Sequence, residues 1–96
     1  MMTPSRSHAK KLRDIRTAEG ITQADFAKML EIGIGTVRNY ESGHREAGMG
    51  IIDKVVNHPR FTKYTLWLMT GQTLPNAGQV CPAESADESN QSARSA

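Results

Sequence analysis

The sequence has only one cysteine, Cys81, and only five aromatic residues among its 96. A single cysteine cannot form an intramolecular disulfide, and it cannot supply the several ligands of a structural zinc site. No hydrophobic run is long enough to act as a signal peptide or to span a membrane. These absences predict a small cytoplasmic protein without membrane contact, stabilised by its hydrophobic core.

Patterns of catalytic residues are also missing. The three histidines, His8, His44 and His58, form no cluster in the sequence. There is no nucleophile–base pair, no Gly-rich phosphate loop and no paired set of carboxylates. We therefore expect no enzymatic activity, no catalytic residue, no metal and no cofactor.

Apolar residues are concentrated in the first three quarters of the chain, between Leu12 and Leu74. After Pro75 the sequence is dominated by Ala, Ser, Asn, Gln and Glu, a composition that does not build a core. We predict a flexible basic N-terminus at residues 1–6, one domain at 7–74 and a disordered polar tail at 75–96.

Charge is unevenly distributed between these parts. Residues 1–74 contain eleven Lys or Arg against seven Asp or Glu, a balance of +4, whereas the rest of the chain carries −2. A mildly basic domain is compatible with a polyanionic partner such as nucleic acid, but many small proteins are equally basic.

The spacing of apolar residues indicates helices throughout the domain. Ser7 and Thr22 are good N-caps, Gly20 is suited to a left-handed C-terminal stop, and Pro59 ends a helical segment. Met49 is expected to face inward from the fourth helix, and the first helix is expected to turn Lys10, Lys11, Arg13 and Asp14 toward solvent. We predict an all-α domain with five helices, at residues 7–19, 23–30, 34–42, 49–57 and 62–69.

The third helix has two different faces when each residue is advanced by about 100°. The inner face, expected to contact the core, consists of Thr36, Val37, Tyr40 and Glu41. The outer face is small, polar and basic: Ile34, Gly35, Arg38, Asn39 and Ser42. A short amphipathic helix, a tight turn and a second helix with such a face are typical of a helix-turn-helix, whose second helix enters the DNA major groove.

Residues 12–43, LRDIRTAEGITQADFAKMLEIGIGTVRNYESG, resemble the Cro/C1-type (XRE-like) helix-turn-helix of phage repressors and related bacterial regulators. The segment YTLWLMTG at 64–71 looks like the helix that closes this domain in phage-derived members. The shared positions are Arg16, Gly20, Thr22, Gln23, Phe26, Ala27, Leu30, Ile32, Thr36, Val37, Tyr40, Glu41 and Gly43. The resemblance implies a compact five-helix fold like that of lambda repressor.

The resemblance also implies roles for individual residues. Base contacts are implied for Ile34, Gly35 and Asn39, with Arg38 beside them. An ion pair between Arg16 and Glu41 would tie the first helix to the third. Phosphate contacts are implied for Gln23 and Ser42, and further candidates are Thr22, Lys10, His44 and Arg45.

The sequence departs from the family pattern at the turn and at the start of the third helix. Glu31 stands where Gly is usual, although a non-Gly residue at positive φ costs about 1 kcal/mol. Gly33 replaces the frequent Ser or Thr cap. Ile34 and Gly35 replace a polar pair, and Ile34 could contact only a thymine methyl or exclude water. Direct readout is therefore expected to rest on Arg38 and Asn39.

The fifth helix is apolar on two sides. Phe61, Tyr64, Trp67 and Leu68 occupy one arc, whereas Leu66 and Met69 lie on the other. We predict that Leu66 and Met69 form a homodimer contact, the alternative being that loops and the tail cover them. A dimer would read two half-sites about 34 Å apart on a near-palindrome.

Together these patterns predict a sequence-specific regulator of transcription that binds double-stranded DNA, a repressor from a phage or another mobile element, associated with the nucleoid when bound to DNA. One alternative is a DNA-binding antitoxin that binds its toxin through the C-terminal tail. Another is a helical protein-interaction module that has lost DNA binding.

Overall fold

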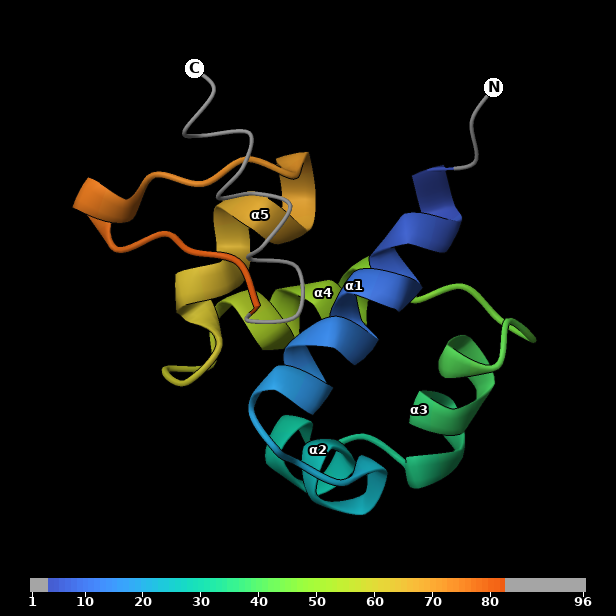
Figure 1. Cartoon of the computed structure of the whole chain (residues 1–96). Helices are drawn as coiled ribbons and strands as arrows, with labels where there is room; N and C mark the ends of the chain where they lie inside the picture. Colours follow the sequence, from blue (N-terminus) through green and yellow to red (C-terminus); the bar gives the residue numbers. More distant parts are fainter. Residues whose placement is uncertain (1–3, 83–96) are drawn as a thin grey trace.

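Five α-helices and two short 3₁₀ turns make up residues 4–82, the part of the chain that the computed structural model describes (Figure 1). None of these helices is long and apolar enough to cross a membrane. The elements are α1 Pro4–Ala18, α2 Gln23–Leu30, α3 Ile34–Glu41, α4 Met49–Val56, η1 Thr62–Tyr64, α5 Thr65–Thr70 and η2 Pro75–Ala77.

Helix α1 begins three residues earlier than predicted, at Pro4, so Ser7 lies within the helix and is not its cap. Proline is well tolerated here because its missing N–H would have no intrahelical partner in the first turn. Residues 4–6 are therefore helical and not a flexible lead-in, while residues 1–3 lie outside the described part. The helix ends at Ala18, and Gly20, in the turn that follows, has the expected left-handed conformation with φ 70°.

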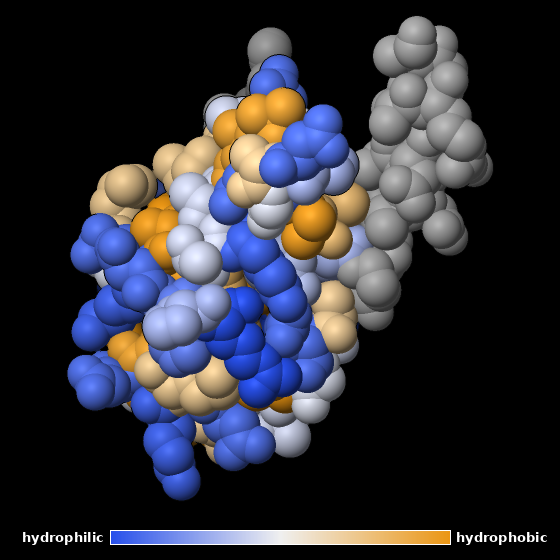
Figure 2. Space-filling model, turned by 90° about the vertical axis from the view of Figure 1, so that its left-hand side faces the viewer, coloured by the Kyte–Doolittle hydropathy of each residue, from blue (hydrophilic) through white to orange (hydrophobic). Residues whose placement is uncertain are grey.

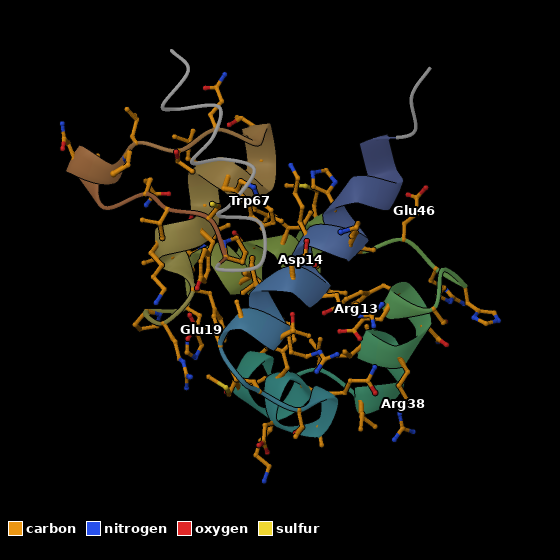
Figure 3. All side chains as sticks on the ribbon, in the orientation of Figure 1. Arg13, Asp14, Glu19, Arg38, Glu46 and Trp67 are labelled. Carbon is orange, nitrogen blue, oxygen red and sulfur yellow. The ribbon has the colours of Figure 1, made fainter. Side chains whose placement is uncertain are left out.

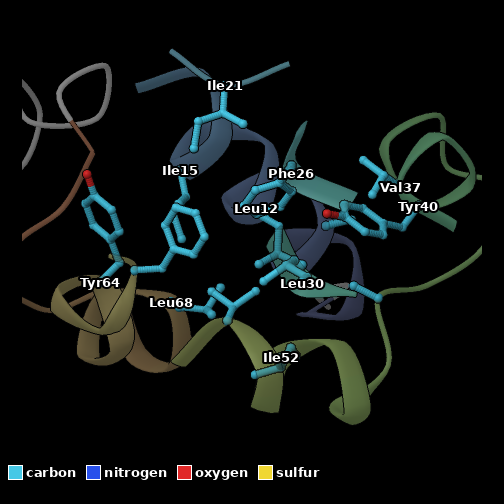
Figure 4. Close-up of a cluster of buried hydrophobic side chains, with 14 of the residues drawn as sticks. Leu12, Ile15, Ile21, Phe26, Leu30, Val37, Tyr40, Ile52, Tyr64 and Leu68 are labelled. Atoms are coloured by element: carbon cyan, nitrogen blue, oxygen red, sulfur yellow. The ribbon is translucent and has the colours of Figure 1, made fainter. Parts of the chain in front are cut away.

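The core surrounds α1, which contacts both α3 and α5 (Figures 1 and 4). Leu12 and Ile15 on α1 are fully buried. Phe26 of α2 meets Phe61 edge to face, with ring centroids 5.2 Å apart. Each such side chain contributes about 1.5–3 kcal/mol through burial, so the helix-turn-helix and the closing helix share one core.

Lys11 was expected to face solvent, but it is half-buried against the end of α5. Its Nζ donates to the carbonyl oxygens of Trp67 at 3.1 Å and Leu68 at 3.4 Å, and it lies 5.4 Å from the centroid of the Trp67 ring. Carbonyls in the last turn of a helix lack intrahelical partners and attract a cation. Burial lowers the pKa of Lys11.

Two residues assigned to inner faces are exposed instead. Thr36 is exposed, and Met49 keeps 65% of its surface accessible. Thr36 lies about 70° from the centre of the buried arc that Val37 and Tyr40 define on α3, and Met49 about 90° from the centre of the arc that Ile52 and Val55 define on α4. Both residues thus stand at the edge of the apolar stripe and beyond the reach of the core.

Residues 75–82 pack against the domain and do not form the disordered tail that composition predicted. Leu74 and Gln79 form an antiparallel bridge, and the N–H of Val80 donates to the carbonyl of Lys63 at 2.9 Å. The Gln79 side chain accepts from the N–H of Leu66, a free donor in the first turn of α5. Pro82 is buried. Composition missed these contacts because only a few residues make them, Gln79 through its amide and Val80, Cys81 and Pro82 through packing. The predicted tail beyond Pro82 lies outside the described residues.

The fifth predicted helix is divided into two parts. Residues 62–64 form η1, and α5 runs only from Thr65 to Thr70. Thr62 gives no side-chain cap; its carbonyl instead accepts from the Thr65 hydroxyl at 2.8 Å and from the Gln79 amide at 3.1 Å. These bonds hold the tight first turn.

Glu19, just beyond the end of α1, joins that end to η1. Its carboxylate accepts from Tyr64 Oη at 2.5 Å, Arg60 Nε at 2.8 Å and Lys63 Nζ at 3.1 Å. Burial alone would raise the pKa of Glu19, but the bonds from Tyr64, Arg60 and Lys63 outweigh it and lower the pKa to about 2. Burial and the bond to Glu19 raise the pKa of Tyr64.

Replacing Glu19 with Gln is expected to reduce the free energy of unfolding by about 1–2 kcal/mol at neutral pH, because three donors lose a charged acceptor and two of them remain half exposed. The folded pKa of Glu19 lies below its unfolded value, so this stabilisation is complete above about pH 5 and is lost as the pH falls toward 2. Thermal unfolding of both proteins across this range measures the effect. A difference in Tm that stays constant on acidification would contradict it.

Candidate nucleic-acid interface

Helix α2 begins and ends where its sequence signals predicted. The Thr22 side chain accepts from the N–H of Asp25 at 3.0 Å and caps the helix. Ile21, just before the cap, is buried with Phe26, as in a hydrophobic staple. The entry angle of α2 is therefore fixed by one hydrogen bond and one apolar contact.

Glu31 makes the turn between α2 and α3 in the left-handed region, with φ 58° and ψ 46°. Its N–H donates to the carbonyl of Lys28 at 3.1 Å, and the N–H of Ile32 donates to that of Ala27 at 2.9 Å. This is a Schellman end, in which Ile32 packs back on the core. These contacts offset the strain of about 1 kcal/mol that a non-Gly residue carries here.

Helix α3 presents two faces, largely as predicted. Val37 and Tyr40 are buried, whereas Gly35, Arg38 and Asn39 are exposed. Ile34 is half-buried against the core, so only part of its side chain is accessible. Arg38 projects away from the rest of the domain (Figure 3). The side chains of Arg38 and Asn39 form no hydrogen bond or ion pair with any described residue.

Gly35 has a right-handed helical conformation, and a Cβ built at this position meets no atom within 4 Å. The fold therefore does not require glycine at position 35. Glycine costs about 1 kcal/mol relative to Ala in a helix interior, so packing within the described residues does not explain Gly35.

An ion pair anchors α3 to α1. The Glu41 carboxylate accepts from Arg16 Nε at 2.7 Å and from Arg16 Nη2 at 2.9 Å. The Glu41 side chain is 6% exposed and the Arg16 side chain 14%. Arg16 also donates to the carbonyl of Ile21 at 2.9 Å. The pair that the family resemblance implied is present, and its two-point geometry fixes the rotation of α3.

Gln23 joins this network at the start of α2. Its Nε2 donates to Glu41 Oε1 at 2.9 Å. A side-chain amide has two N–H donors, so the contact to Glu41 leaves one hydrogen available. The predicted phosphate contact at Gln23 therefore lies beside the ion pair, with its orientation set by Glu41.

The end of α3 is closed by backbone and side-chain bonds. The carbonyl of Asn39 accepts from the N–H groups of His44 at 2.9 Å and Arg45 at 3.2 Å. Ser42 Oγ lies 2.6 Å from His44 Nδ1, and Gly43 has φ 87°. Ser42, His44 and Arg45 are exposed. The predicted phosphate ligands of this loop thus have defined positions next to the exposed face of α3.

The remaining predicted site residues lie on other elements. Thr22 is exposed but uses its oxygen as the cap, and Lys10 on α1 has a side chain that is 75% exposed. Leu66 is half-buried and Met69 is 43% exposed on α5, which lies across α1 from α3 (Figure 1). The proposed dimer residues are therefore separated from the helix-turn-helix face.

Comparison with known proteins agrees with this geometry. A family model described as helix-turn-helix matches residues 12–61. Repressor protein C of Escherichia phage P2 is 34% identical over 79 residues, which cover 82% of this chain and 80% of that protein. The chain belongs to the Cro/C1-type helix-turn-helix family. As a member of this family, it is a DNA-binding transcriptional regulator.

Two features of this helix-turn-helix domain depend on how its helices meet. Arg13 is exposed, as predicted, and lies between α1 and α3 (Figure 3). Tyr40 is buried, but its hydroxyl has no hydrogen-bond partner within residues 4–82, and burial raises its pKa. Periodicity locates a residue on its own helix, whereas both features depend on which helices meet.

Replacing Glu41 with Ala is expected to lower the free energy of unfolding of this domain by about 3 kcal/mol, because Arg16 and Gln23 then lose a shared, buried partner. The matched control is Glu46→Ala, since Glu46 is exposed and forms no ion pair with a described residue; we expect a change within about 0.5 kcal/mol. Thermal or urea unfolding measures both. Equal Tm values for Glu41→Ala and the unmodified protein would refute the structural role.

Proposed function

We propose that the chain is a transcriptional repressor of phage or mobile-element type, which binds a near-palindromic operator as a dimer by inserting α3 into the major groove. The observation that carries this proposal is the α3 face on which Arg38 and Asn39 stand exposed, held in register from behind by the Arg16–Glu41 pair. The name of its phage P2 relative supports repression.

The chemistry of this face suits base recognition. Arg38 can donate twice to guanine O6 and N7, and Asn39 can bond adenine N6 and N7. Gly35 allows the backbone to approach the bases, and the half-buried Ile34 offers a small apolar contact for a thymine methyl. Each good bidentate contact discriminates against the wrong base by about 1–3 kcal/mol.

The residues around this face suit phosphate binding. Gln23 stands at the N-terminus of α2, where the helix dipole and free N–H groups favour an anion. Thr22 contributes its hydroxyl hydrogen there, and Ser42, His44 and Arg45 follow the other end of α3. These contacts carry no sequence information but set the position of α3 on the duplex.

Selection of bound sequences from random duplex DNA is expected to give two half-sites in which defined positions depend on Asn39. Asn39→Ala should lose preference at those positions while the rest of the motif is retained. The control is Asn57→Ala, an exposed amide at the end of α4 that bonds Asp53 and should leave the motif unchanged. An unaltered motif with Asn39→Ala would assign specificity to other residues or to DNA shape.

The dimer is proposed to form through α5 and the segment that follows it. Met69 is 43% exposed and Leu74 56% exposed there. Leu66 is half-buried, and its N–H donates to the Gln79 side chain. The face of the domain in Figure 2 shows hydrophobic residues as separate patches among hydrophilic ones. Such patches suit a modest, reversible contact better than a permanent one.

Sedimentation is expected to find a dimer on a full operator, and Met69→Gln should weaken it while binding to an isolated half-site is unchanged. Met49→Gln is the control, because Met49 is also exposed, at 65% against 43% for Met69, but lies on α4 and not on α5. A monomer both free and on the full operator would remove the dimer from this proposal. The same function places the protein in the cytoplasm, where it would associate with the nucleoid when bound to DNA.

A further inference from the structure

Helix α5 is short and depends on its neighbours for its position. It has only six residues, Thr65–Thr70, fewer than a helix needs to be stable alone. Its N-terminal end follows η1 directly, and the Gln79 side chain accepts from the N–H of Leu66 there. The C-terminal end, which carries the exposed Met69, is held by a different contact.

Lys11 of α1 makes that contact. Its Nζ donates to the carbonyl oxygens of Trp67 and Leu68 and stands over the Trp67 ring. Burial of Trp67 and Leu68 also holds α5 against the core, but the hydrophobic effect has no direction. Hydrogen bonds depend on angle and distance, so Lys11 limits how far the end of α5 can slide or rotate on α1.

The Lys11 ammonium is committed to this helix end and differs from the surface cations of the domain. Lys11 is half-buried and forms no ion pair within residues 4–82. Its neighbour Lys10, in contrast, has a side chain that is 75% exposed and pairs with Asp14. The carbonyls of a last helical turn carry partial negative charge, which a cation stabilises. The two adjacent lysines of α1 therefore have different surroundings.

Helix α1 connects α5 to α3 through Lys11 and Arg16. Arg16 holds α3 by its two bonds to Glu41. Lys11 and Arg16 are five residues apart, so they leave α1 in directions about 140° apart and at points about 7.5 Å apart along its axis. This agrees with the positions of α3 and α5 on opposite sides of α1 (Figure 1). The position of α5 relative to the exposed face of α3 is therefore transmitted through α1.

In a dimer that forms through α5, this relation sets the distance between the two recognition helices. A two-fold axis repeats the same relation in both protomers, so a displacement of α5 relative to α3 acts twice on the separation of the α3 helices. Half-sites one helical turn apart are about 34 Å apart, and one added base pair moves the second half-site by about 3.4 Å and turns it by about 35°. Only a firmly held α5 lets a dimer distinguish such operators.

We propose that Lys11 is a positioning residue that fixes the spacing between half-sites which the dimer accepts. This inference rests on the proposed function, because it takes the dimer through α5 as its starting point. It assigns part of the operator specificity to a contact between α1 and α5, on the side of α1 away from α3. Arg38 and Asn39 would read the bases of each half-site, and Lys11 would set the distance between the half-sites.

The test measures binding of the full chain to the operator obtained by selection, and to the same operator with one base pair added to or removed from its centre. With the unmodified protein, either change is expected to weaken binding about tenfold, because both half-sites can no longer be held without strain. Lys11→Met keeps a long unbranched side chain beside Trp67 but removes the charge and the donors. We expect its discrimination between spacings to fall to about two- to threefold.

Two control variants separate the bonds of Lys11 from its charge. Lys54→Met removes the same charge from an exposed residue of α4 and is expected to keep the full discrimination. Lys11→Arg keeps the cation and its donors and can stack on Trp67, so it is expected to keep most of it. If Lys54→Met or Lys11→Arg loses discrimination as fully as Lys11→Met, the bonds to α5 are not the cause and the proposal is overturned.

Affinity for an isolated half-site shows whether Lys11→Met acts on position or on folding. A positioning role predicts half-site affinity within about twofold of the unmodified protein, because α3 and its ion pair to α1 are untouched. If Lys11→Met loses half-site binding to the same degree as binding to the full operator, Lys11 serves the stability of the whole domain and the positioning role is overturned.

The unmodified protein distinguishes failure of this inference from failure of the dimer. If it discriminates between spacings and Lys11→Met discriminates equally, only the role of Lys11 is overturned. If it binds the full operator no more tightly than a half-site at any spacing, no dimer forms on DNA, and the dimer proposal fails together with this inference. Reduced discrimination with unchanged half-site affinity in Lys11→Met supports the proposal.

Discussion

The two-point ion pair between Arg16 and Glu41 is the interaction on which the arrangement of the interface depends. It joins α1 to α3 with bonds of 2.7 and 2.9 Å and is almost fully buried. Desolvation of two charges cancels much of their attraction, so such a pair adds little net stability compared with apolar residues. Its geometry, however, allows α3 only one rotation about its own axis. Because the exposed face of α3 is defined by that rotation, the pair decides which side chains of α3 face solvent.

This anchoring explains how α3 can contain residues that are poor for a helix. The helix has eight residues, begins at Gly33 without a side-chain cap and carries Gly35 in its first turn. A helix of this length is not stable alone. Burial of Val37 and Tyr40 and the bond to Arg16 hold it from one side only. On the opposite side only Ile34 packs against the core, and a side chain at position 35 would meet no atom within 4 Å, so packing places little constraint on the composition of this face.

The sequence predicted what depends on local chemistry and missed what depends on the meeting of distant segments. Thr22, Gly20 and the apolar spacing set the bounds of α2, and the resemblance to a known family placed the Arg16–Glu41 pair. Lys11 was misassigned because only the arrival of α5 supplies its carbonyl partners. Residues 75–82 were misassigned because one side chain, Gln79, makes contacts that composition does not register. The exposed face of α3 was predictable from the periodicity of that helix alone. The groove between α1 and the end of α3 was not, because residues of α1 form one of its walls.

Helix α1 therefore has a larger role than support for the helix-turn-helix. Arg16 balances the charge of Glu41, and Glu41 in turn orients the Gln23 amide. Without Arg16, a phosphate approaching Gln23 would meet an uncompensated carboxylate 2.9 Å from the donor atom. When Arg16 is present, its charge balances that of the Glu41 carboxylate. The carboxylate then accepts one N–H of the Gln23 amide, and the other N–H stays available for the proposed phosphate contact. One residue of α1 thus holds α3 in place and neutralises the carboxylate beside the proposed phosphate contact at Gln23.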